Sequence, residues 1–181
     1  QMNRVFDAAN YANVNVVPSF ALLNDAAMNF GRERIRVFRH AMAIDPKEKE
    51  EADKTIVEAR AKIEKAFRDY EPLIADPEDR SMLEAERKIM QEYDKAADAV
   101  LELSRANRLD EVRAALSKQV SPLAMSFNSQ LEKHIRYNEN LGKKSAAEGA
   151  AANETATLTV VAIVVVGCNA VALLSFAIIG G

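Results

Sequence analysis

Arg32, Arg34, Arg36 and Arg39 fall within eight residues of one apparently helical stretch. An arginine keeps its charge and its planar set of donors everywhere in a protein, so one on a buried helix face must meet a carboxylate or a comparable acceptor. Apolar residues around these arginines recur at helical spacing. They form a stripe that we predict to face the core: Val17, Phe20, Ala27, Gly31, Phe38 and Ala41.

Arg34 lies on that stripe, together with Asn24, whereas Arg36 and Arg39 lie at its flanks or beyond. A buried Arg34 would be a candidate for holding an anionic ligand. The alternative is an internal salt bridge to Glu58 or Glu86, or a side chain that extends along apolar surface to solvent. For Arg32 and Arg36 we expect a solvated or dimer-facing position.

Other chemistry has no recognisable residues. His40 and His134 are the only histidines, and neither has a second histidine at helical spacing that could complete a metal or haem site. No nucleophile with an adjacent base and no glycine-rich phosphate loop is present. We therefore expect no enzyme activity, no metal and no cofactor. The net charge of −3 argues against nucleic acid as a partner.

The composition favours helices, because Trp is absent and Gly and Pro are few. Asp45-Pro46 and Asp76-Pro77 each combine a helix stop with a helix start, and a third break falls near Asn107. Helices are predicted at about 1–44, 48–74, 78–106 and 108–153. Short connections force neighbouring helices to run antiparallel, so the fold class is all-α, an up-down-up-down four-helix bundle.

No charged residue follows Glu154, and Thr157 to Ile179 is almost wholly apolar. About twenty such residues suffice to cross a bilayer, so residues 154–181 are predicted to form a transmembrane helix continuous with the fourth helix. We expect Asn169 within it to pair across a helix interface. The chain is interpreted as a fragment, with an earlier membrane span missing before Gln1.

The stretch NVNVVPSFALLNDAAMNFGRERIRVFRHAM, followed by three more helices and a span, resembles the sensor module of bacterial methyl-accepting chemotaxis proteins. The resemblance implies a ligand-binding bundle of residues 1–153 in the periplasm, a second membrane helix of residues 154–181 in the inner membrane, and a homodimer formed through the first helix. The cytoplasmic parts that such receptors use for their signalling partners are absent from this chain.

Aspartate receptors of that family hold the ligand's carboxylates with arginines of the first helix, and Arg34 and Arg39 reproduce one of the family's spacings. Ala43 stands where a further arginine would follow, so the resemblance does not imply aspartate itself. On the fourth helix, Pro122 would correspond to a proline of the family's pocket, which makes Ser121 a candidate for hydrogen bonding.

Counting residues from the predicted hairpin tips gives a second view of the pocket. It sets Arg34 level with Ala59 on the second helix, Tyr93 to Ala97 on the third, and Lys118 to Pro122 on the fourth. Tyr93 and Gln119 thereby become candidates. A guanidinium, a phenol and an amide around one cavity would suit a di- or tricarboxylate such as malate or citrate.

We therefore expect the ligand-sensing domain of a transmembrane chemoreceptor, which binds a small organic anion. Two alternatives stay open. The bundle could instead be a membrane-anchored module for protein binding or oligomerisation, in which case its arginines should all be paired internally and no cavity should exist. It could also be the input domain of a sensor histidine kinase.

Overall fold

The computed structural model describes the backbone of residues 10–179 and the side chains of residues 10–151, 154, 155 and 157–159. Within residues 10–179 every long element is a helix and no strand is present, as predicted. The long elements are α2 (Val17–Met42), α3 (Pro46–Tyr70), α4 (Pro77–Arg105), α5 (Leu109–Ala115) and α6 (Ser121–Ile179). A single 3-10 turn, η2 (Glu71–Leu73), follows α3.

The helix ends lie where the turn residues predict them. The side chain of Asp45 accepts a hydrogen bond from the backbone N–H of Lys47 at 2.9 Å, and Pro46 occupies the first turn of α3. Asp76 caps α4 in the same way, accepting from the N–H of Glu78 and of Asp79. These caps satisfy backbone donors that a helix start leaves unpaired.

Two π-helical turns, η1 (Ala12–Val16) and η3 (Leu116–Val120), each end shortly before a proline, Pro18 or Pro122. A proline lacks the backbone N–H, and its ring presses on the carbonyl one turn earlier. A wider turn relieves both problems. Consequently α5, η3 and α6 follow one another without a loop, as one helical segment of the bundle.

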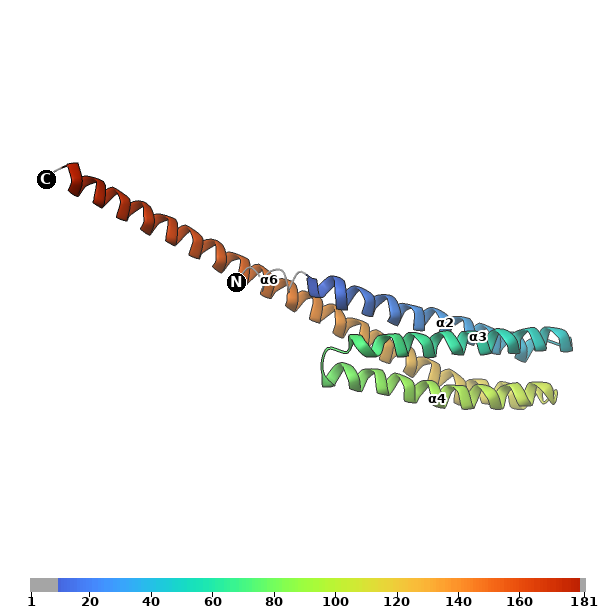
Figure 1. Ribbon diagram of the computed structural model, residues 1–181. Coiled ribbons are helices and arrows are strands. Elements are labelled where there is room, and N and C mark those ends of the chain that lie inside the picture. Colours follow the sequence, from blue (N-terminus) through green and yellow to red (C-terminus); the bar gives the residue numbers. More distant parts are fainter. Residues whose placement is uncertain (1–9, 180–181) are drawn as a thin grey trace. The chain divides into compact units, whose positions relative to one another are not determined.

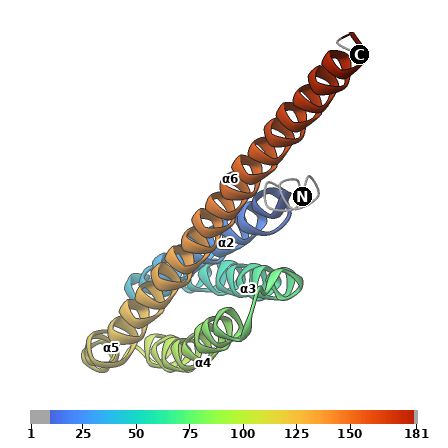
Figure 2. The ribbon, with the colours of Figure 1, turned by 90° about the vertical axis from the view of Figure 1, so that its left-hand side faces the viewer.

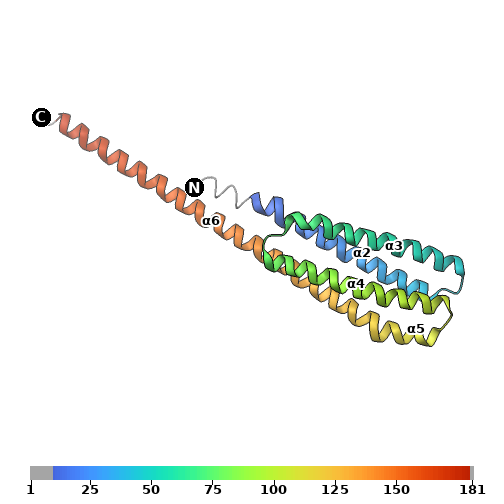
Figure 3. The same ribbon diagram turned by 60° about the horizontal axis from the view of Figure 1, so that its bottom comes forward.

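Residues 15–139 form one compact unit, and the remainder of α6 belongs to a second. Figures 1 and 3 show α2, α3 and α4 of the first unit side by side and joined by short loops. Figure 2 shows α5 next to the end of α4. The four helical segments of this unit thus form an antiparallel bundle, which confirms the predicted all-α fold.

An aromatic cluster joins all four segments at mid-height. Phe30 of α2 lies 4.8 Å from Tyr93 of α4 and 4.5 Å from Phe127 of α6, measured between ring centroids, and Phe67 of α3 lies 6.3 Å from Phe127. All four rings are buried. Such tilted and edge-on contacts add to the stabilisation that burial alone gives.

The predicted core face of α2 is wrong by one residue along most of the helix. The buried side chains of η1 and α2 are Val16, Ser19, Leu23, Ala26, Asn29, Phe30, Glu33, Val37, His40 and Ala41. Ala41 is the member of the predicted stripe that is buried as expected. Val17 and Phe38, which we predicted to be buried, are 60% and 42% exposed. Two apolar stripes run along this helix, about 100° apart, and spacing alone does not tell which one the bundle covers.

A buried polar cluster fastens α6 to α3 and α4. The ring nitrogens of His134 lie 2.6 Å from the Asp79 carboxylate and 2.9 Å from the Glu86 carboxylate. The hydroxyl of Tyr70 donates to Asp79 at 2.7 Å and accepts from the side-chain amide of Asn138 at 2.7 Å. Both ring nitrogens face carboxyl oxygens, an arrangement that favours the imidazolium form of His134.

The surroundings of His134 account for this charge. Burial alone would lower the pKa of His134, but the hydrogen bonds to Asp79 and Glu86 outweigh it and raise that pKa to about 9. Burial of Glu86 raises the pKa of its carboxyl group. Asp79 also accepts from the backbone N–H of Ala75, and together with His134 this contact outweighs burial and lowers the pKa of Asp79.

The predicted membrane helix, residues 154–181, lies largely outside the residues whose side chains are described. Its backbone is helical as far as Ile179. Among the described residues, no helix combines the length and the apolar character that crossing a bilayer requires.

Replacing His134 by alanine should lower the free energy of unfolding by about 3–5 kcal/mol at neutral pH, because two buried carboxyl groups lose their cation. The stabilisation from protonated His134 is complete below the unfolded-state pKa of 6.5 and is lost as the pH rises through about 9. The difference in unfolding free energy between wild type and His134→Ala should therefore narrow between pH 6.5 and about pH 9, and stay constant above it, in urea unfolding followed by circular dichroism. The exposed neighbour Lys133 provides the control, since Lys133→Ala should change stability by less than about 0.5 kcal/mol. A gap that is constant with pH would contradict this assignment.

Candidate ligand-binding site

The arginine-rich part of α2 carries guanidinium groups without carboxylate partners. Arg34 is half-buried, and its guanidinium carbon lies 5.8 Å from the centre of the Phe30 ring. Arg36 is half-buried and Arg39 is exposed. Within the described side chains, none of the three forms an ion pair. The fourth, Arg32, donates a hydrogen bond to the side chain of Asn29 at 3.0 Å.

Most of the remaining described arginines behave differently. Carboxylates within 4.0 Å hold Arg60, Arg68, Arg87, Arg105, Arg108, Arg113 and Arg136. The exception is Arg80, which is exposed on α4 and forms no ion pair with a described side chain. The alternative in which Arg34 pairs with Glu58 or Glu86 is not what the structure contains, because Glu86 contacts His134 and no ion pair joins Arg34 to Glu58. The charges of Arg34, Arg36 and Arg39 are thus available to an outside anion.

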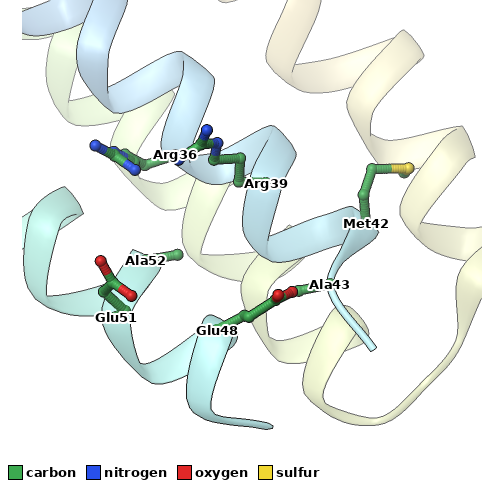
Figure 4. A pocket seen from close by; sticks show the side chains of 7 residues that line it. All are labelled: Arg36, Arg39, Met42, Ala43, Glu48, Glu51 and Ala52. Atoms are coloured by element: carbon green, nitrogen blue, oxygen red, sulfur yellow. The ribbon is translucent and has the colours of Figure 1, made fainter. Parts of the chain in front are cut away.

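Two hollows lie beside these arginines. The first, of about 440 Å³, separates Arg36 and Arg39 on α2 from Glu48 and Glu51 on α3 (Figure 4). Its walls carry opposite charges that do not reach each other as ion pairs. Met42, Ala43 and Ala52 complete its lining.

The second hollow, of about 560 Å³, lies on the outer face of α2 and is mostly apolar. Its lining comes from α2 alone and consists of Gly31, Arg34, Ile35, Phe38, Arg39 and Met42, so it is an open depression on one helix. Pockets for small ligands in proteins have volumes of about 300–1,000 Å³. Both hollows are therefore large enough for a small organic acid, and Arg39 borders both.

The structure places the predicted site residues at different depths. Arg34 and Arg39 line one hollow, and Tyr93 is buried, with a hydroxyl group that has no hydrogen-bond partner. Arg34 lies near enough to Tyr93 for its charge to influence that phenol. Gln119 is exposed and Ser121 half-buried, and neither makes a described contact with Arg34. Binding by these five residues stays a prediction.

Sequence reasoning missed Glu33, which is the charged residue of this part of α2 that is fully buried. Its carboxylate accepts a hydrogen bond from Nε of Arg60 at 2.8 Å, and Arg60 also contacts Asp94 and Asp98 of α4. Level counting had placed Arg34 opposite Ala59 and Tyr93. The contact forms at that height, but through Glu33, one residue before Arg34, and Arg60, one residue after Ala59. The sequence feature that could have revealed it is the second apolar stripe of this helix, at positions 26, 30 and 37, because position 33 lies on the same stripe.

Comparisons with known proteins agree with this architecture. Residues 1–152 match the family described as a four helix bundle sensory module for signal transduction, which is the module of methyl-accepting chemotaxis proteins. No individual curated protein matches the chain. That family is a sensory family and not an enzyme family. The match covers most of the 181 residues, and so this chain belongs to the four-helix-bundle sensory modules of methyl-accepting chemotaxis proteins.

Proposed function

We propose that this chain is the ligand-sensing module of a transmembrane chemoreceptor and that its ligand is a small organic anion with two or three carboxylates, such as malate or citrate. The observation that carries the proposal is the set of unpaired guanidiniums beside two hollows on α2. An arginine fork binds a carboxylate with two parallel hydrogen bonds, which gives both strength and orientation. We expect Tyr93, Gln119 and Ser121 to contribute less than the arginines, because none of them is charged.

The charges favour the hollow on the outer face of α2. In the hollow of Figure 4, Glu48 and Glu51 stand opposite the arginines and would repel a second carboxylate. The outer hollow has Arg34 and Arg39, and no carboxylate, in its lining. A dicarboxylate is therefore better accommodated there.

The outer face of α2 also suits pairing with a second copy. Its positions, exposed except for the half-buried Gly31, alternate by four and three residues, which is the spacing of a coiled-coil seam. They are Val17, Ala21, Asn24, Met28, Gly31, Ile35, Phe38 and Met42. A side chain added at Gly31 would meet no atom within 4 Å in a single chain, so this position has room for a neighbouring helix. We propose a parallel homodimer through this seam, with Asn24 fixing its register.

Such a dimer would cover the apolar lining of the outer hollow, so the anion site would lie at the arginines on either side of the seam. Arg34 and Arg39 occupy the two positions that flank the seam and that face each other across parallel coiled coils. Arg34 of one copy would then stand against Arg39 of the second copy. Two cations at that distance repel unless an anion lies between them, so a dicarboxylate would bridge the copies at each of two symmetric places.

We further propose that residues 154–181 are the second membrane helix and that residues 1–153 lie in the periplasm, attached to the inner membrane. Support comes from the absence of charge after Glu154 and from the family of the bundle. Ligand at the seam would shift the packing of the bundle helices, and the helix continuous with α6 would pass that shift toward the membrane.

Replacing Arg34 by alanine should weaken binding of malate or citrate by about 10- to 100-fold, because a charged hydrogen-bond pair is lost. Isothermal titration calorimetry across a panel of organic acids and amino acids would measure this. Arg80→Ala, which removes the same charge from an exposed position on α4, should leave the affinity unchanged. Unaltered binding by Arg34→Ala, or no heat with any carboxylate, would instead favour a protein-binding or oligomerisation module.

Ile35→Glu should dissociate the dimer, because it places two like charges at the centre of an apolar seam. Ile35 is 60% exposed in the single chain, so the monomer fold should survive. Analytical ultracentrifugation in detergent would record the change in mass. Val57, which is 65% exposed on α3, gives the matched control, since Val57→Glu should leave the mass unchanged. Equal masses for wild type and Ile35→Glu would rule out this seam.

A further inference from the structure

Three carboxyl groups surround one guanidinium where α2, α3 and α4 meet, with one of the three inside the bundle and two nearer its surface. Arg60 of α3 lies 2.8 Å from Glu33, 3.2 Å from Asp94 and 2.8 Å from Asp98. Glu33 is fully buried, whereas the side chains of Asp94 and Asp98 are 32% and 57% exposed. One cation cannot neutralise three anions in such a place, and an unpaired charge inside a protein is strongly unfavourable.

The unpartnered oxygens of this cluster indicate how the excess charge is removed. Oε2 of Glu33 and Oδ1 of Asp94 are buried and form no hydrogen bond among the described groups. Both carboxyl groups lie against the same nitrogen, Nε of Arg60, which is 2.8 Å from Glu33 and 3.2 Å from Asp94. Two carboxylates held this near each other repel, and the repulsion is relieved when one of them carries a proton. Glu33, the more deeply buried, is the group that holds it.

We propose that the module takes a proton as a second input: Glu33 of α2 and Asp94 of α4 share one proton inside the bundle, and its loss drives these two helices apart. This proposal stands independently of the anion site, since it concerns only groups within one chain. Its consequence for signalling is direct, because α2 is also the helix that carries the unpaired arginines and the exposed seam.

The groups that face the shared proton set the pH at which it leaves. Burial of Glu33, followed by the charge of Asp94, raises the pKa of Glu33 to about 8, against the opposing effect of Arg60 on α3. On α4, Asp98 also acts on Asp94, and burial raises the pKa of Asp94. Tyr93 of α4 is the neighbouring phenol, influenced by both Glu33 and Arg34. The charged groups that act most on Glu33, Arg60 and Asp94, belong to α3 and α4.

The sign of the effect follows from linkage. Unfolded glutamate has a pKa of 4.5, so between pH 4.5 and about 8 the folded chain binds a proton that the unfolded chain has released. Stability from this site is therefore lost as the pH rises across that interval and is constant above it. A module that contains this pair should respond to mildly alkaline conditions, whereas an ordinary surface glutamate would not titrate there.

A carbon-13 titration of the full 181-residue chain in detergent tests the shared proton directly. The side-chain carboxyl carbon of Glu33, assigned through its own backbone resonances, should shift with a midpoint near pH 8. A midpoint below about 5.5, within the ordinary glutamate range, would overturn the proposal. This measurement uses the wild-type chain and needs no ligand, so it is independent of whether any carboxylate binds.

Thermal unfolding of Glu33→Gln tests the consequence. Glutamine keeps the shape and can donate to Asp94 permanently, so the melting temperature of wild type should fall by about 5–10 °C relative to Glu33→Gln between pH 6 and pH 9. Subtracting the melting temperature of Glu33→Gln from that of wild type at each pH removes the pH dependence that His134 gives to both proteins. Asp98→Asn removes an exposed carboxylate from the same guanidinium and should give no comparable trend. Parallel melting curves for wild type and Glu33→Gln would overturn the coupling.

Discussion

α2 has two apolar faces, and a single bundle can cover only one of them. The face with Leu23, Phe30 and Val37 enters the core, which leaves Ile35 and Phe38 on the outside. The other features of the module depend on this division. This division also decides where the charged residues of α2 lie. Glu33 falls on the inner face, where burial favours its neutral, protonated form. Arg34 and Arg39 fall beside the outer face, where they keep their charge.

The interior of the bundle is held partly by charge, in two separate clusters. Arg60 ties α2 and α3 to α4, while His134 ties α6 to α4 and, through Tyr70, to α3. Buried ion pairs of this kind contribute little net stability compared with well-packed apolar residues, yet removing one partner is costly. Their effect is to make one register of the helices lower in free energy than the neighbouring registers, in which these charged groups would lose their partners. For a sensory module, defined registers are useful, because a small displacement between them can carry a signal.

The two clusters share a shortage of positive charge. His134 lies between two carboxyl groups, and two buried oxygens of its cluster, Oε2 of Glu86 and Oδ1 of Asn138, have no hydrogen-bond partner. Around Arg60 the carboxyl groups outnumber the cation as well, and two buried oxygens have no hydrogen-bond partner. Both clusters depend on a proton, so both can be altered by the pH. The first acts where α6 meets α3 and α4, and the second acts where α2 meets α3 and α4.

The sequence by itself determined the all-helical bundle, because Asp45-Pro46 and Asp76-Pro77 mark helix ends through local hydrogen bonding and backbone restriction. It also led to the correct family, through the order of helices and the arginines on the first of them. The sequence also indicated which parts of α2, α3 and α4 lie at the same position along the bundle axis, because short loops leave little freedom to slide one helix along the next.

The tertiary structure alone decided which face of α2 is buried. Helical spacing fits both the stripe through Gly31 and Arg34 and the stripe through Phe30 and Glu33, and only the shapes of the facing helices select between them. We predicted the first, and the bundle covers the second. The pairing of Glu33 with Arg60 and Asp94, and of His134 with Asp79 and Glu86, was equally out of reach, because residues far apart in sequence become neighbours only after packing.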